Sequence, residues 1–216
     1  LDFAIYSIND QPVVATSSID SIYAIESLNY LSFAKVIQLI NSRAFSSMYC
    51  PNPRDPLIIN LRMFTKNKNI FNAIANTLSS ELSSKLLDRK YSYEYRNESN
   101  QVRSISSVSI EHLINKAIIF IKDDNQILGN TKLTELCNLS CGNSNSACKV
   151  LTENEVKEYT GMTRLIDFNK YGVTIARPNN NTMATNLDSD IMEQGAGVQF
   201  CAMCFQNKDS FLKQYE

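Results

Sequence analysis

The chain has 216 residues, of which 44% are hydrophobic and 20% are charged, and this is the composition of a globular domain with a sizeable core. Its formal net charge is −1, which argues against nucleic acid as a partner, because binding a phosphate backbone needs a concentrated basic face. The longest apolar run, residues 117–121, is far too short to cross a bilayer, so no transmembrane segment is expected. The chain begins at Leu1 inside a predicted strand, and we expect it to be part of a longer protein.

In the first half of the chain, short apolar runs alternate with longer amphipathic segments. The apolar runs predict strands at residues 2–7, 13–16, 57–63 and 117–121, with a turn around Asn9–Asp10 after the first. Apolar residues at helical spacing predict helices over residues 31–45 and 70–87. A short helix is expected at residues 110–115. It carries the only histidine, His112, which we place at the surface rather than in a catalytic site.

The second half of the chain continues this alternation. Strands are predicted at residues 148–151, 172–176 and 198–204, and helices over residues 153–168 and 208–215. Thr152 and Glu155 have the spacing of a capping box at the start of the first of these helices.

Strands that alternate with helices predict an α/β protein with a parallel sheet covered by helices. Seven strands in a chain that starts inside a strand predict a TIM-type (β/α)8 barrel, incomplete here because its first strand would precede Leu1. The strands are expected to be parallel and to follow one another around the barrel. A doubly wound open sheet is the alternative, but no glycine-rich phosphate loop follows any strand, which argues against a dinucleotide-binding version.

Three of the six cysteines, Cys137, Cys141 and Cys148, lie in the segment "CNLSCGNSNSAC". A zinc site is disfavoured there, because structural zinc takes four Cys or His ligands. A disulfide is a second interpretation, and free thiols are the preferred one, since cytosolic chains keep their thiols reduced. Cys201 and Cys204 have CxxC spacing, but residues i and i+3 of a strand face opposite sides, so we do not expect them to bind a metal together.

Six segments, in order along the chain, resemble the catalytic barrel of phosphoinositide-specific phospholipase C. "LDFAIYSINDQPVVATSS" is similar to a strand pair of the family, and "LSFAKVIQLINSRAF" to the helix that follows it. The other four are "DPLIINLRM", "SSVSIEHLINKAIIFIK", "LIDFNKYGVTIARP" and "GAGVQFCAMCFQNKDSFLKQY". The resemblance covers most of the chain. It implies one barrel domain over residues 1–216, with an X-like half at 1–122, a linker loop at 123–147 and a Y-like half at 148–216.

The family cleaves the phosphodiester of a phosphoinositide with two histidines and, in its eukaryotic branch, a Ca²⁺ ion held by acidic ligands. By this resemblance Asp2 matches an aspartate ligand, which makes it a weak metal candidate. The second histidine falls at Thr16 and another acidic ligand falls at Arg62, where a guanidinium repels Ca²⁺. We expect Asp2 to pair with Arg62 instead, because a paired charge costs less to bury than a lone one.

The later motifs of the family are also only partly kept. Lys122 matches a lysine at the end of the fifth strand, with Asp124 two residues after it. The arginine that contacts substrate falls at Ile175, and the tyrosine two residues later falls at Arg177. Arg62, Lys122 and Arg177 all lie at predicted carboxyl ends of strands, the face on which barrel sites form. They form either a phosphate-binding mouth or a set of solvated rim charges.

Two functions follow from the resemblance. The first is a degenerate, catalytically inactive module with a structural or binding role, which keeps affinity for an inositol phosphate or a phosphoinositide headgroup. The alternative is an active phosphoric diester hydrolase with a rearranged site, and only this alternative implies Ca²⁺ as a cofactor. Thr16 and Ile175 favour the first. A cytoplasmic location, peripheral at membranes, is expected in both cases.

Overall fold

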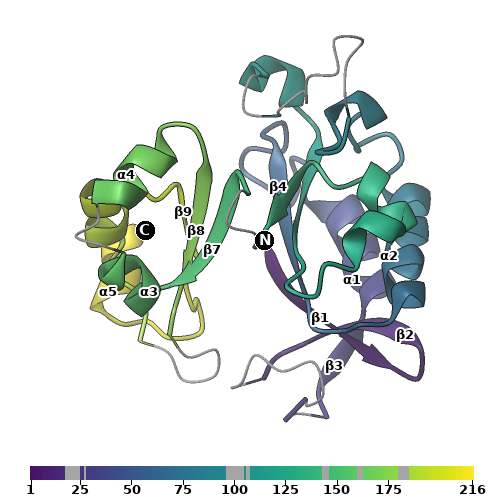
Figure 1. Cartoon of the computed structure of the whole chain (residues 1–216), viewed down its shortest axis with the longest axis horizontal. Coiled ribbons are helices and arrows are strands. Elements are labelled where there is room, and N and C mark those ends of the chain that lie inside the picture. Colours follow the sequence, from purple (N-terminus) through teal and green to yellow (C-terminus); the bar gives the residue numbers. More distant parts are fainter. Residues whose placement is uncertain are drawn as a thin grey trace. The chain divides into compact units, whose positions relative to one another are not determined.

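The computed structural model of the chain describes residues 1–17, 25–26, 28–95, 105, 108–142, 146–159, 163–179 and 185–216. These residues form a mixed α/β protein that divides into two compact units. The N-terminal unit holds the described residues of Leu1–Thr16 and Asp20–Ser140, and the C-terminal unit holds Ser17 and the described residues of Cys141–Glu216. Figure 1 labels helices and strands in both units.

The described residues of the N-terminal unit form a sheet whose strands have the order β3-β2-β1-β4-β5. The central strands β1, β4 and β5 run parallel, as predicted, and β2 and β3 pair antiparallel with their neighbours. Their bounds are β1 (Asp2–Ile8), β2 (Gln11–Ala15), β3 (Tyr30–Ser32), β4 (Leu57–Met63) and β5 (Ala117–Lys122).

The prediction that all strands are parallel and sequential is wrong for β1 and β2. They form an antiparallel hairpin, in which Ile5 faces Val14 and Ile8 faces Gln11. The physical reason is the turn between them, because parallel neighbours need a crossover of about a dozen residues or more, whereas two residues suffice for a hairpin. Asn9 and Asp10 have φ values of 48° and 56°, the left-handed conformation that a type I′ hairpin turn requires at both central positions.

Helices cover one face of this sheet. The N-cap Asn67 accepts a hydrogen bond from the backbone of Asn69 at the start of α2, and His112 is exposed on η3, as predicted. Helix α2 ends at Glu81 rather than at residue 87, and Leu86 instead bridges to β5. The helical elements are α1 (Phe33–Arg43), α2 (Lys68–Glu81), η1 (Arg89–Tyr91), η3 (Ile110–Leu113), η4 (Leu128–Asn130) and η5 (Lys132–Glu135).

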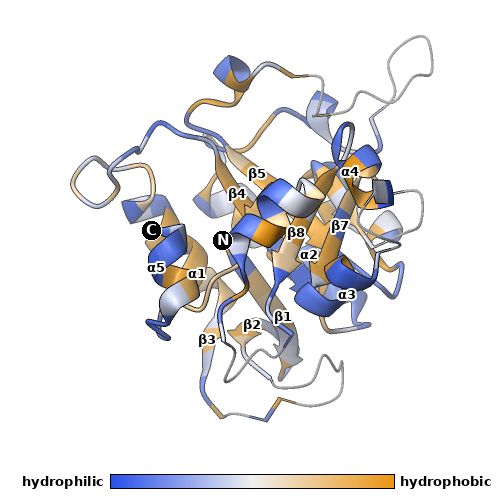
Figure 2. Cartoon of the chain, turned by 90° about the vertical axis from the view of Figure 1, so that its left-hand side faces the viewer, coloured by the Kyte–Doolittle hydropathy of each residue, from blue (hydrophilic) through white to orange (hydrophobic). Residues whose placement is uncertain are grey.

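The two faces of the sheet differ because side chains alternate along each strand. Ile59 and Leu61 of β4 pack into the main core with α1 and α2, and Figure 2 shows β4 and β5 coloured mostly hydrophobic. Asn60 and Arg62 of the same strand project to the opposite face. Residues of the hairpin form a smaller apolar cluster of their own, namely Ala4, Tyr6, Val13 and Ala15. Polar groups of β4 are therefore kept on the face that the helices leave uncovered.

The described residues of the C-terminal unit form parallel strands in the order β6-β7-β8-β9, and the boundary between the units along the chain falls within β6. Three α-helices and a π-helix accompany them, with a core that includes Val156, Leu165 and Met192. The elements are β6 (Leu139–Cys141), β7 (Cys148–Thr152), α3 (Glu153–Glu158), α4 (Thr163–Asn169), β8 (Val173–Arg177), η6 (Ile191–Gly195), β9 (Phe200–Cys201) and α5 (Ser210–Tyr215).

The predicted capping box is present. The Thr152 hydroxyl accepts from the backbone of Glu155, and the Glu155 carboxylate accepts from the backbone of Thr152. The single helix expected over residues 153–168 is two helices, and residues 160–162 between them lie outside the described part of the chain. No helix among the described residues is long and apolar enough to span a membrane.

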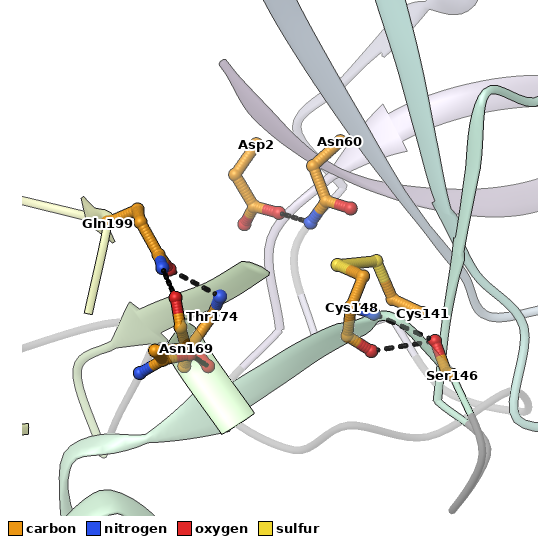
Figure 3. The surroundings of a disulfide bond; sticks show 8 residues. All are labelled: Asp2, Asn60, Cys141, Ser146, Cys148, Asn169, Thr174 and Gln199. Atoms are coloured by element: carbon orange, nitrogen blue, oxygen red, sulfur yellow. Dashed lines mark hydrogen bonds between the residues drawn. A yellow bond between two sulfur atoms is a disulfide. The ribbon is translucent and has the colours of Figure 1, made fainter. Parts of the chain in front are cut away.

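The preference for free thiols in the cysteine-rich segment is wrong for two of its three cysteines. Cys141 and Cys148 form a disulfide with their Cα atoms 4.6 Å apart (Figure 3), whereas Cys137 is a free, buried thiol. The reason is the register, because Cys141 at the end of β6 is the direct partner of Cys148 at the start of β7. The Ser146 hydroxyl accepts from the backbone N–H of Cys148 and donates to its carbonyl, which orders the approach to β7.

Candidate functional site

The uncovered face of the N-terminal sheet carries the ion pair that the sequence predicts. Arg62 Nε donates to both carboxylate oxygens of Asp2, at 3.0 Å to Oδ2 and 3.3 Å to Oδ1. The side chains are 9% exposed for Arg62 and 22% for Asp2, so the pair is mostly removed from water. Parallel pairing of β1 with β4 sets this contact, since Asp2 faces Asn60 and the next residue on that face of β1, Ala4, faces Arg62.

Two further contacts fix the position of the ion pair. Asn60 Nδ2 donates to Asp2 Oδ1 at 2.6 Å, so the carboxylate accepts hydrogen bonds from two side chains of β4. The Arg62 guanidinium lies 5.5 Å from the centroid of the Phe64 ring, and that ring stacks on Tyr6 at 5.1 Å. A cation over an aromatic face is attracted by the ring quadrupole, so Arg62 is held by a carboxylate and by a ring.

Lys122 lies directly beside Arg62. The two residues are register partners at the carboxyl ends of β4 and β5, and such partners project to the same face of a parallel sheet, about 4.8 Å apart. Lys122 Nζ is 3.5 Å from Asp124 Oδ2, and the lysine side chain is 19% exposed. The loop that carries Asp124 is shaped by the buried Asp123, which accepts from the backbone of Leu128 at 2.7 Å. The structure therefore brings Asp2, Arg62 and Lys122 together.

Thr16 follows β2 directly and is exposed. Because β2 runs antiparallel to β1 and Val14 faces Ile5, its carboxyl end points back toward the start of β1, where Asp2 lies. A threonine hydroxyl does not titrate near neutral pH as an imidazole does. Thr16 therefore supplies a hydroxyl, but no general base, at this end of the hairpin.

The other two predicted site residues belong to the C-terminal unit. Ile175 is 6% exposed and faces Val150 of β7, so it is an apolar packing residue. Arg177 is partly buried at the end of β8, where it faces Thr152. It projects to the same side of β8 as Ile175, because the two are separated by one residue. The common mouth of Arg62, Lys122 and Arg177 stays a prediction.

One polar residue on the uncovered face of the N-terminal sheet, Asn60, has no role in the sequence-based predictions. Asn60 is 2% exposed in the middle of β4, "LIINLRM", whose other residues apart from Arg62 are apolar. The signal was available in the sequence, because Asn60 and Arg62 stand two residues apart and must share a face. Among the described residues, no three His, Cys, Asp or Glu side chains gather as metal ligands.

No protein-family model and no curated protein matches this chain. Solved structures do match it. The crystal structure of L. pealei PLC21 aligns with a TM-score of 0.66 at 13% identity and covers 98% of this chain, which spans 30% of that protein. A Ca²⁺-dependent phosphatidylinositol-specific phospholipase C from Streptomyces antibioticus aligns with a TM-score of 0.53 at 10% identity, over 82% of this chain and 72% of that one. The chain therefore has a phospholipase-C-like, mixed α/β fold.

Proposed function

We propose that this chain is a catalytically inactive, phospholipase-C-like barrel module that binds an inositol phosphate or a phosphoinositide headgroup. The observation that carries the proposal is the placement of Arg62 and Lys122 as register partners on one face of the sheet. Two cations on neighbouring strands can both donate to one phosphate group. The ligand class follows the Streptomyces antibioticus protein of the same fold, which is specific for phosphatidylinositol.

The charges around this pair suit a ligand that is anionic and also carries hydroxyl groups. Arg62 is paired with Asp2 and Lys122 with Asp124, so the four side chains are neutral in sum. A carboxylate beside each cation accepts hydrogen bonds from ligand hydroxyls, while the cations donate to a phosphate oxygen.

The absence of turnover is proposed from three residues. Thr16 stands where the resemblance implies a histidine, and loss of a general acid or base removes roughly 10²–10⁴-fold in rate. Arg62 stands where the resemblance implies an acidic metal ligand, and it is paired with Asp2. Ile175 has no donor for a phosphate oxygen, and it is buried.

Assay of the intact protein tests the proposal. Phosphatidylinositol in mixed micelles is incubated with the protein in Ca²⁺ and, separately, in a chelator, and released inositol phosphate is measured. We expect no release, and calorimetric titration with myo-inositol 1-phosphate is expected to show binding. Lys122→Met should weaken that binding, whereas Lys132→Met, at an exposed lysine of the same unit, should not. Turnover within a hundredfold of ~10 s⁻¹, a typical enzymatic rate, would establish the active hydrolase instead.

The expected peripheral location at membranes is tested by sedimentation with lipid vesicles. Vesicles that contain phosphatidylinositol should sediment the protein, and vesicles of phosphatidylcholine alone should not. Equal sedimentation with both would leave headgroup recognition without support.

A further inference from the structure

Asn60 has a buried acceptor that the ion pair does not use. Its Nδ2 donates to Asp2 at 2.6 Å, but no donor among the described residues reaches its Oδ1. A buried acceptor without a partner costs about 1–3 kcal/mol, and such groups in folded proteins call for an explanation. Exchanging the oxygen and nitrogen of the amide by rotation does not provide a donor for Oδ1. It would turn Oδ1 toward the Asp2 carboxylate, which has only acceptors when ionised.

The position of this oxygen relates it to the two cations. Asn60 lies two residues before Arg62 on the same face of β4, roughly 6.6 Å along the strand. Its neighbours in register are Asp2 on β1 and Phe120 on β5. Figure 3 shows the amide nitrogen directed to Asp2 and the oxygen directed away from it. The acceptor therefore lies one step along the strand from the Arg62–Lys122 pair, a separation that one cyclic polyol can span.

We propose that Asn60 Oδ1 accepts a hydrogen bond from a ligand hydroxyl while Arg62 and Lys122 hold the anionic group of the same ligand. The site then takes phosphate esters of polyols in preference to simple anions. An anion that lacks a donor cannot satisfy Oδ1 and gains no affinity from Asn60. Asp2 positions the acceptor, because its bond to Nδ2 fixes the orientation of the amide. This inference rests on the proposed function and adds a specificity-determining residue to it.

Two ligands distinguish the contribution of a ligand hydroxyl to binding from that of the ligand's negative charge. The first is myo-inositol 1-phosphate, and the second is inorganic sulfate, which has no hydrogen-bond donor at neutral pH. The intact wild-type protein, Asn60→Ala and the control Asn138→Ala are titrated with each. Asn138 is also a buried asparagine, but its Oδ1 accepts from Ile119 and its Nδ2 donates to Tyr91. Loss of Asn138 therefore perturbs packing and removes no vacant acceptor.

Asn60→Ala is expected to weaken binding of inositol 1-phosphate about five- to tenfold, the effect of one hydrogen bond, and to change the affinity for sulfate by less than about twofold. Asn138→Ala should leave the ratio of the two affinities unchanged. An equal loss for both ligands, or no loss for either, would overturn the inference while the proposed function stands. Failure of the wild-type protein to bind either probe would overturn both.

A second measurement covers the case in which Asn60→Ala does not fold. In the folded wild-type protein, the side-chain amide resonances of Asn60 are followed by NMR during each titration. We expect them to shift with inositol 1-phosphate and not with sulfate. Resonances that stay in place with inositol 1-phosphate, although the ligand binds, would show that the acceptor serves the fold alone.

Discussion

At the residue scale, the Asp2–Arg62 pair makes a contribution to stability that can be measured. Arg62→Met would leave a mostly buried carboxylate without its cation, and breaking such a pair is costly because the remaining charge stays desolvated. We expect a loss of about 2–3 kcal/mol in the free energy of unfolding, measured by urea denaturation. The control is Arg89→Met, since Arg89 and Glu135 pair with side chains 73% and 56% exposed. A loss under about 1 kcal/mol is expected there, and similar losses for both variants would contradict the argument.

A second residue-scale prediction concerns Gly172, in the turn between α4 and β8. A Cβ atom at this position would lie 2.4 Å from Cζ of Phe168, so the ring would have to move from its place against the C-terminal core. Gly172→Ala is therefore expected to destabilise the protein by about 1–3 kcal/mol, the usual effect of overpacking. Thermal unfolding measures it. Gly129→Ala is the matched variant, because its nearest contact would be a side-chain oxygen at 3.8 Å, and a comparable loss there would refute the steric explanation.

Some residue-level features could be predicted from the sequence and others could not. The Asp2–Arg62 pair was predictable, because the resemblance placed both residues at ligand positions of one metal site. The role of Asn60 was not, since the direction of its amide depends on Asp2, which is 58 residues away in the chain. The thiol of Cys137 was indistinguishable in sequence from those of Cys141 and Cys148, because only the register of β6 with β7 selects the bonded pair.

At the scale of elements, the strands with continuous apolar runs were predicted well. β4 (57–63) and β5 (117–122) match within one residue, because four or more consecutive buried positions leave little doubt about a central strand. β3 was missed since its three residues are all exposed, and two of them, Leu31 and Ser32, were assigned to the helix that follows. β6 was missed because it lies in a polar, glycine-containing segment. β9 has two residues rather than the seven expected. The Asn9–Asp10 turn did carry the hairpin signal, which the expectation of a uniform barrel outweighed.

The Cys141–Cys148 disulfide links β6 to β7 in addition to the backbone. A single register pair, Cys141 with Cys148, is found between these strands in the described part of the chain. Closing a loop of this length, a sequence separation of 7, reduces the entropy of the unfolded chain by an amount worth about 2 kcal/mol. We expect the double variant Cys141→Ser, Cys148→Ser to lose about that much stability in urea denaturation. Cys50→Ser, at a free and partly exposed cysteine, should lose less than about 0.5 kcal/mol.

The Cys141–Cys148 disulfide is also relevant to the cellular compartment of the protein. Glutathione and thioredoxin keep most cytosolic cysteines reduced, so a stable Cys141–Cys148 bond favours an oxidising compartment over the cytoplasm expected from sequence. Peptide mapping of the protein isolated from its source, alkylated before lysis, decides between them. A linked peptide that contains both cysteines supports the oxidised form, and two alkylated peptides would support the cytoplasmic expectation.

At the scale of the whole molecule, the fold persists where the sequence identity is only 10–13%. Apolar patterning and side-chain volume determine whether a core forms, and both tolerate extensive substitution. In contrast, a reaction depends on particular groups such as an imidazole, and loss of one general acid or base slows it roughly 10²–10⁴-fold. This explains why segment order along the chain could indicate the fold class, whereas the absence of turnover, which rests on the resemblance at Thr16, Arg62 and Ile175, stays a proposal.

The six cysteines allow one experiment to test both the burial of the free thiols and the presence of the disulfide. Burial raises the pKa of Cys137, and in Cys201 burial and the nearby Glu193 raise it to about 12. Since the thiolate is the nucleophile, only ~1 in 10,000 of the Cys201 thiols is reactive at pH 8. Burial also raises the pKa of Cys204, with Asp209 adding to the effect.

Native protein treated with iodoacetamide at pH 8 should therefore be alkylated first at Cys50, more slowly at Cys204, and not at Cys137 or Cys201 within the same time. Denaturation without reductant should expose four reactive thiols, and reductant should raise the number to six, because the Cys141–Cys148 bond withholds two. Mass spectrometry of the peptides measures each step. Labelling of Cys137 in the native protein would contradict the packed N-terminal core. Six labels without reductant would contradict the disulfide. The burial of Cys137 and the disulfide are therefore tested by different outcomes of the same experiment.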